Sequence, residues 1–154
     1  MAKLDELKQY KNIHMIGIGG TSMSGIAEIL KNWNFNVTGS DLSTSENTDK
    51  LIKSGIKVTI GHDFGSLSRA DIVVYSAAIP KNDPELEKAK NMHIQTIERA
   101  DFLGMITRAF NDTICISGTH GKSTTTSMLS VCFLEAGMDP SIQVGATLKQ
   151  IKRK

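Results

Sequence analysis

Short apolar runs alternate with helical patterns along the chain. The runs are rich in β-branched residues and bounded by turn residues, and they predict strands at 13–18, 36–40, 57–60, 71–76, 93–97, 113–117 and 141–144. Between them, apolar residues spaced three and four apart predict helices near 23–33, 45–54, 84–91, 98–109 and 122–136. This alternation predicts an α/β fold in which a Rossmann-like parallel sheet is flanked by helices.

Local signals mark several helix ends. Gly55 and Gly137 follow helical patterns, where glycine readily adopts the left-handed conformation that ends a helix. Asp83 precedes Pro84, and this pair suits an N-cap followed by the first residue of a helix.

A domain boundary is expected at 108–113, where one helix ends and a new strand, glycine loop and helix begin. Residues 1–110 then form the Rossmann-like domain, and residues 111–154 form the truncated start of a P-loop domain. A segment of about forty residues rarely folds alone. We expect its apolar side chains to pack on the first domain, to pair with a second copy in a homodimer, or to stay mobile.

Composition excludes several classes of protein. The 154 residues are 40% hydrophobic and 22% charged, with a net charge of +2 and no basic stripe, so no nucleic-acid partner is expected. No long apolar run or leader-like start is present, which predicts a cytoplasmic protein that does not bind a membrane. Cys115 and Cys132 lie in apolar patterns and are expected to be reduced and buried.

The later glycine-rich turn runs from Gly118 through Thr119, His120, Gly121 and Lys122 to Ser123. A turn between a strand and a helix directs main-chain amides at one point, which suits a phosphate. There the lysine would contact the β- and γ-phosphates of ATP, and the serine hydroxyl would ligate Mg²⁺. The spacing is shorter than in the usual motif, and the alternative is a Ser/Thr-rich helix start with an incidental Gly-Lys-Ser.

The earlier turn, residues 17–22, follows the first predicted strand and opens the first helix. A dinucleotide-binding fold places a pyrophosphate at this point, held by main-chain amides. Asp41 lies at the end of the second strand, where such folds read a ribose hydroxyl. Because Ser22 replaces the third glycine of that fingerprint, the turn indicates a nucleotide without identifying it. A purely structural tight turn is the alternative.

The sequence assigns no functional role to several other polar residues. His14, His62 and His93 begin or flank strands and are expected at surface or edge positions. The acidic residues of the 84–91 helix are expected to be solvated. The sequence at 62–65 is expected to be a turn.

Four segments together resemble the Mur ligases. They are GIGGTSMSGIAEIL at 17–30, GSD at 39–41, SAAIP at 76–80 and GTHGKSTTTSM at 118–128, and the resemblance runs from about residue 13 to residue 145. It implies three domains, of which this sequence would hold the first and the opening of the second. It also implies an ATP-dependent ligase of peptidoglycan precursor synthesis, in which phosphorylation of the lactyl carboxylate of UDP-N-acetylmuramate gives an acyl phosphate that L-alanine attacks. A related acceptor in the family is a preformed peptide.

The resemblance also implies a set of site residues. Those expected to hold the UDP-sugar lie in the first turn, at the end of the second strand and after the fourth: Gly17, Gly19, Gly20, Thr21, Ser22, Met23, Ser24, Ser40, Asp41, Ser76, Ala77, Ala78, Ile79 and Pro80. Those expected to hold ATP are Gly118, Thr119, His120, Gly121, Lys122, Ser123 and Thr124, with Lys122 and His120 catalytic and Ser123 on Mg²⁺. This piece alone is expected to be inactive.

Two other classes of function account for part of the sequence. A nicotinamide-dependent dehydrogenase or nucleotide-sensing module would use the first turn and leave the second unexplained. A stand-alone P-loop phosphotransferase would use the second turn and leave most of the first domain idle.

Overall fold

The computed structural model describes residues 6–145 of the chain. It divides into two compact units, Met1–Thr113 and Ile114–Lys154. None of the helices in the described range is long and apolar enough to cross a membrane.

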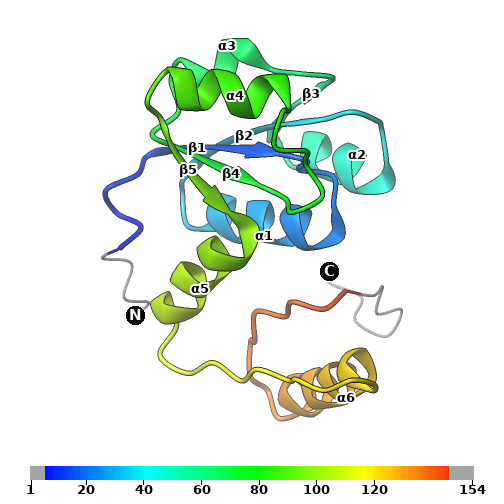
Figure 1. Cartoon of the computed structure of the whole chain (residues 1–154). Coiled ribbons are helices and arrows are strands. Elements are labelled where there is room, and N and C mark those ends of the chain that lie inside the picture. Colours follow the sequence, from blue (N-terminus) through cyan, green and yellow to red (C-terminus); the bar gives the residue numbers. More distant parts are fainter. Residues whose placement is uncertain (1–5, 146–154) are drawn as a thin grey trace. The chain divides into compact units, whose positions relative to one another are not determined.

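The first unit is a parallel sheet with helices between its strands (Figure 1). The strands lie in the order β3-β2-β1-β4-β5, and every pair of neighbours is parallel. The predicted Rossmann-like α/β fold is therefore confirmed. Its elements are β1 (Asn12–Ile16), α1 (Thr21–Asn32), β2 (Asn36–Asp41), α2 (Glu46–Lys53), β3 (Lys57–Ile60), α3 (Phe64–Leu67), β4 (Ile72–Tyr75), α4 (Pro84–Asn91), β5 (Gln95–Glu98) and α5 (Arg99–Ala109).

Helices cover both faces of this sheet, as α1 and α4 on opposite sides show (Figure 1). One apolar cluster joins the sheet to α1, α2 and α5 through side chains such as Ile26, Leu51 and Phe102. A smaller cluster joins the other face to α3 and α4 through Leu67 and Leu86. Burial on both faces explains why the central strands read as nearly continuous apolar runs.

The sheet has a close contact at Gly39 in β2. A Cβ at this position would lie 2.6 Å from the Met15 carbonyl oxygen and 2.6 Å from Ile18 Cδ1. The turn after β1 therefore packs directly on the β2 backbone, which brings the two strand ends together.

The predicted helix boundaries are confirmed within a few residues. Asp83 caps α4 by accepting hydrogen bonds from the amides of Glu85 and Leu86, with Pro84 as the first helical residue. Gly55 and Gly137 have positive φ after α2 and α6 (Lys122–Glu135), respectively. The expected turn at 62–65 is wrong, since the short helix α3 begins at Phe64, where the Asp63 side chain accepts the Ser66 amide.

The second unit contains the glycine loop and α6 (Lys122–Glu135). The strands predicted at 113–117 and 141–144 do not form. Those predictions are wrong because a strand needs a neighbour for its amides and carbonyls, and neither segment pairs with another within the described chain. Cys115 and Cys132 are free thiols, as predicted, but both are exposed. Their predicted burial required packing against a sheet that the described part of this unit lacks.

Candidate functional site

An open cleft of about 230 Å³ lies where the carboxyl ends of the strands meet. β1 and β4 are neighbours, while the chain runs outward from them to β2 and β3 on one side and to β5 on the other. Ligands of open α/β sheets bind outside the strand ends at such a switch point. The cleft is therefore the candidate site of the first unit.

The cleft brings together residues from all three segments predicted to hold a UDP-sugar. Among the residues that line it are Gly17, Gly20, Ser40, Asp41, Ser76, Ala78 and Ile79. Of the other predicted residues, Met23 has its side chain in the core, and Ser24 is buried with its hydroxyl donating to the Thr21 carbonyl. Ala77 and Pro80 are exposed beside the cleft-lining residues of the same loop.

The amides of the first glycine turn are already bonded within the fold. Those of Gly17 and Ile18 donate to the Ser40 carbonyl at 2.8 and 3.0 Å, and that of Gly20 donates to the Gly17 carbonyl at 3.2 Å. The Gly19 amide donates to Asp41 Oδ2 at 2.9 Å. β2 and the turn itself therefore take up these four donors, and binding of the UDP-sugar by the first turn remains a prediction.

Main-chain donors remain at the start of α1. The amides of Thr21 and Met23 lie in its first turn, where helical amides lack an intrahelical partner, and they donate to no group in the described part of the chain. The helix dipole adds positive character at this end. An anion at this turn would therefore meet the helix start rather than the glycines.

A buried polar chain lies beneath the cleft. His14 on β1 and Glu85 on α4 are both fully buried. His14 Nε2 lies 2.6 Å from Glu85 Oε1, and its Nδ1 lies 2.8 Å from the Thr38 hydroxyl. The Ser40 hydroxyl donates to Glu85 Oε2 at 2.7 Å. The expected surface position of His14 and the expected solvation of Glu85 are both wrong, because each is the hydrogen-bond partner of the other.

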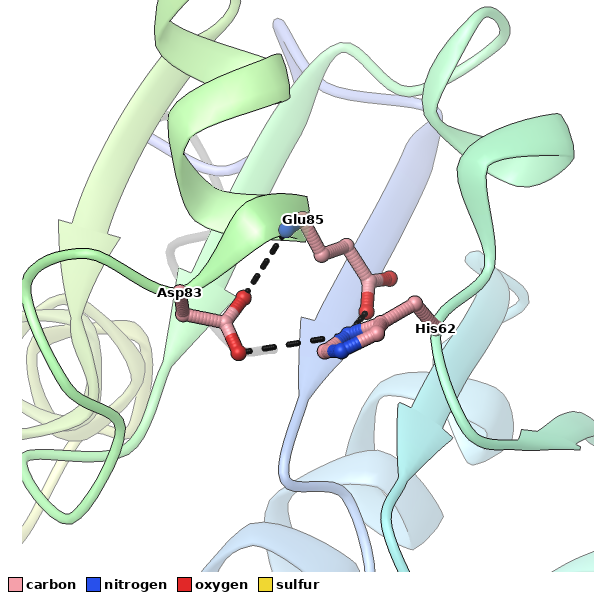
Figure 2. A group of neighbouring side chains, drawn as sticks. All are labelled: His62, Asp83 and Glu85. Atoms are coloured by element: carbon pink, nitrogen blue, oxygen red, sulfur yellow. Dashed lines mark hydrogen bonds and ion pairs between the residues drawn. The ribbon is translucent and has the colours of Figure 1, made fainter.

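His62 extends this chain to the cleft surface (Figure 2). Its Nδ1 lies 3.5 Å from Glu85 Oε2 and 3.9 Å from Asp83 Oδ2. A proton on Nδ1 would let the ring donate toward these carboxylates, because ionised carboxylates only accept hydrogen bonds. The ring is partly exposed and lines the cleft, so it can offer its remaining edge to a ligand.

The same three residues present ligand atoms within 4.8 Å of one another, a spacing that can hold a metal ion. Their oxygens are largely committed elsewhere. Both Glu85 oxygens accept short hydrogen bonds, from His14 and Ser40, and Asp83 Oδ1 caps α4. We therefore interpret the three residues as a hydrogen-bonded network rather than as a metal site.

Two carboxyl groups around the cleft have shifted pKa values. Burial raises the pKa of Glu85, but the hydrogen bonds from His14 and Ser40 and the charge of His14 lower it more, so its pKa lies below the usual value. Burial likewise opposes ionisation of Asp63. Hydrogen bonds from Ser66 and Thr59 and the charge of Lys57 outweigh it and lower the pKa of Asp63 to about 2. Both groups are thus held as carboxylates.

The second glycine loop has a different geometry from the first. The amides of residues 118–124 donate to no group within the described residues. The Lys122 ammonium instead donates to the carbonyls of Gly118 and Thr119 at 2.6 and 3.2 Å, and Gly121 has a φ of +79° immediately before α6. His120, Ser123 and Thr124 are exposed. Unsatisfied amides, a lysine and a helix start together suit a phosphate chain.

Several residues that line the cleft or lie beneath it were not predicted as site residues from the sequence. His62 follows β3, so it had a usable signal, since the carboxyl ends of parallel strands share one edge of the sheet. Asp83 and Glu85 carried no such signal, because an acidic first turn is usual in solvated helices. His14 sits inside an apolar strand, where its burial depends on a partner 71 residues away.

Comparison with known proteins places these features in a family. A sequence model described as "Mur ligase family, catalytic domain" matches residues 12–111. A UDP-N-acetylmuramate--L-alanine ligase of Acetivibrio thermocellus is 49% identical over 143 residues, which are 93% of this chain and 30% of that protein. The chain thus spans about a third of the length of such relatives.

Solved structures agree with this match. The UDP-N-acetylmuramate-alanine ligase of Thermotoga maritima superposes with a TM-score of 0.84 at 26% identity, over 92% of this chain and 33% of that one. A UDP-N-acetylmuramate:L-alanyl-gamma-D-glutamyl-meso-diaminopimelate ligase of Neisseria meningitides superposes with a TM-score of 0.75 at 29% identity, over 91% and 48% of the two chains. The sheet, the cleft at its carboxyl edge and the matched residues together show that this chain belongs to the Mur ligase family.

Proposed function

We propose that the whole protein is a cytoplasmic UDP-N-acetylmuramate:L-alanine ligase of peptidoglycan synthesis, and that the first unit binds UDP-N-acetylmuramate. The observation that carries this proposal is the cleft at the switch point of the sheet, in a chain about half identical to an enzyme of that name. The Neisseria relative is by its name a ligase of UDP-N-acetylmuramate with a peptide, but it is only 29% identical. L-Alanine is therefore the favoured acceptor.

The residues of the cleft suit a nucleoside. Asp41 Oδ1 and Oδ2 accept amides of Ser43 and Gly19, and each carboxylate oxygen has a further lone pair for a ribose hydroxyl. The Ser40 hydroxyl proton is committed to Glu85, so its oxygen can only accept. Apolar contact comes from Ile79 and Leu42, which also line the cleft.

We infer that the second unit binds ATP with Mg²⁺. The residues fit the group: amides at 118–124 are unsatisfied, and the exposed Ser123 can present its hydroxyl at the start of α6. When bound, ATP supplies the phosphoryl group that turns a carboxylate into an acyl phosphate, and Mg²⁺ neutralises the phosphate charge. Lys122 is exposed, and its ammonium group contacts two carbonyls of the same loop. Rotation of its side chain would bring the ammonium group to the phosphates. His120 lies in the same loop and faces solvent.

Calorimetric titration of the 154-residue chain tests the first part. UDP-N-acetylmuramate should bind, whereas NADH should not compete with it. Absence of binding would overturn the proposal, and a preference for NADH would favour a dehydrogenase-like module instead.

The second part needs the full-length enzyme. Lys122→Ala should lower kcat roughly a hundredfold or more, because removing one positioned transition-state contact has losses of that order. Lys53→Ala, which removes an exposed lysine from α2, is the matched control. Equal turnover by both variants would contradict the role of Lys122. The 154-residue chain alone should form no UDP-N-acetylmuramoyl-alanine.

A further inference from the structure

One carboxylate beneath the cleft is shared by two histidines. Glu85 on α4 and His14 on β1 are both fully buried. Glu85 Oε1 lies 2.6 Å from His14 Nε2, and Glu85 Oε2 lies 3.5 Å from His62 Nδ1. Figure 2 shows the outer half of this link, in which the Glu85 carboxylate and the His62 ring face each other. Glu85 therefore connects the interior of the sheet to a side chain at the cleft surface.

Stability alone does not explain this buried pair. Taking a carboxylate and an imidazole out of water is costly, and well-packed apolar residues in the place of a buried ion pair are often equally stable or more stable. The same face of the sheet already packs against α4 through Leu86 and Ala89. The position of the Glu85 carboxylate is therefore better explained by what its outer oxygen does at the cleft.

The backbone on either side of His62 is fixed by other contacts. Gly61, which has a φ of +96°, donates its amide to the Asp41 carbonyl at 2.8 Å. Asp63 accepts the amide of Ser66 at the start of α3. These contacts set the place of His62, so its side-chain neighbours set the direction of the ring.

Those neighbours hold one edge of the His62 ring. Its Nδ1 faces Glu85 Oε2 and Asp83 Oδ2, and the ring centroid of Phe64 lies 5.9 Å from that of His62. Both carboxylates are themselves anchored, since Asp83 caps α4 and Glu85 is bonded to His14. The ring nitrogen that remains for a ligand is Nε2. Among the described residues that line the cleft, His62 is the one with a basic side chain.

We propose that Glu85, anchored by His14, is a positioning residue that holds the His62 ring with a protonated Nδ1 toward α4 and presents Nε2 to bound UDP-N-acetylmuramate. This inference rests on the proposed function of the first unit. Because Glu85 is fully buried, it acts on the ligand through the His62 ring. Its effect on affinity should therefore exist only while that ring is present.

A double-mutant cycle on the 154-residue chain tests this dependence. Calorimetry gives the affinity for UDP-N-acetylmuramate of the wild type, Glu85→Gln, His62→Ala and the double variant, with the exposed Glu87→Gln on α4 as the control. Glu85→Gln and His62→Ala should each weaken binding about 5- to 10-fold, the scale of one hydrogen bond. The double variant should bind as His62→Ala does, within about twofold, because the ring through which Glu85 acts is already absent. Glu87→Gln should match the wild type.

A purely structural role of Glu85 predicts a different result. Loss of packing would weaken binding equally with and without the His62 ring, so the two losses would add in the double variant. Additive losses would overturn the assignment, and so would an unchanged affinity of Glu85→Gln.

The ring nitrogens give a second measurement that needs only the wild-type fold. In ¹⁵N NMR spectra at neutral pH, the signals that disappear in His62→Ala identify His62, and they should show a proton on Nδ1. The exposed His93 and His120 should instead average over both tautomers. An unprotonated Nδ1 on His62 would overturn the assignment, even if Glu85→Gln does not fold.

The proposed function is tested separately by the wild type. If the wild-type chain binds UDP-N-acetylmuramate, failure of the cycle or of the NMR prediction removes only the role of Glu85. If it does not bind, the proposed function fails, and the ring nitrogens still decide how His62 is held.

Discussion

The buried pair of His14 and Glu85 allows a quantitative prediction. Glu85→Gln keeps the shape of the side chain but removes its charge and turns one acceptor into a donor. Both oxygens accept hydrogen bonds now, from His14 at 2.6 Å and Ser40 at 2.7 Å. In the variant, one of these donors must face an NH₂ group in a site without solvent.

Disrupting a buried pair by changing one partner costs about 3–5 kcal/mol. The amide oxygen of the variant can still accept one hydrogen bond, so we expect a value near the lower end, about 3 kcal/mol. Natural domains have total stabilities of roughly 5–15 kcal/mol. The loss should therefore be visible as a clear shift of the urea midpoint, followed by circular dichroism at pH 7.

The matched control is Glu87→Gln. It makes the same chemical change in the same helix, α4, but at an exposed position. It should change the free energy of unfolding by less than about 0.5 kcal/mol. A loss below about 1 kcal/mol for Glu85→Gln, or equal losses for both variants, would refute the reasoning.

The pH dependence gives a second check. Because the pKa of Glu85 is lowered in the folded state, its stabilisation is fully present above the ordinary glutamate pKa and is lost as the pH falls through the folded value. The gap between wild type and Glu85→Gln should therefore narrow on acidification. A gap of the same size at pH 3 and pH 7 would show that the ionised carboxylate is not its source.

Three further predictions follow from other contacts. Asp63→Asn should lower the free energy of unfolding at pH 7 by about 2 kcal/mol, with the deficit shrinking between pH 3.8 and about 2, because the pKa of Asp63 is lowered across that window; a pH-independent deficit in urea titrations would contradict this. Gly39→Ala should lower the free energy of unfolding by about 1–3 kcal/mol, because the new methyl group overpacks against the Met15 carbonyl. In the control Gly104→Ala, the new methyl group would lie 3.6 Å from the nearest atom, an ordinary contact distance, so the urea midpoint should not fall. The exposed Ile114, Met128 and Met138 should promote homodimers, so light scattering should detect a dimer that disappears on deletion of residues 112–154; a dimer that survives deletion argues against this segment.

The fold of the first unit was predictable because each element carries its own signal. β-branched runs, a capping residue such as Asp83, and closing glycines act over a few residues and agree with the parallel sheet. The segment 113–117 has the same kind of sequence, yet it forms no strand. Strand formation depends on neighbours that a local pattern does not contain.

The candidate site was predictable only in part. Gly17 and Ser76 follow strands and Asp41 ends one, so the topology of a parallel sheet places them at one edge. Glu85 and His14 are brought together by packing of α4 on β1, which the sequence pattern does not specify. A polar residue in such a contact looks like a surface residue until its partner is known.

The two glycine-rich turns show why the same composition can serve different purposes. In the first, glycine permits backbone geometry: Gly17 has a φ of +77°, and a Cβ on Gly19 would lie 2.8 Å from both Asp41 and Thr48. Its amides donate to the carbonyls of Ser40 and Gly17 and to the Asp41 side chain. In the second, the amides of residues 118–124 have no acceptor in the described chain, and Lys122 folds over the loop.

Glycine content therefore indicates where a backbone can approach another group, but not whether that group is the protein or a ligand. The acceptors of the amides distinguish the two cases. By that criterion we propose the second turn as an anion site made of main chain. The first turn uses its amides to join β1 to β2, so an anion beside it would have to meet other donors, such as the first-turn amides of α1.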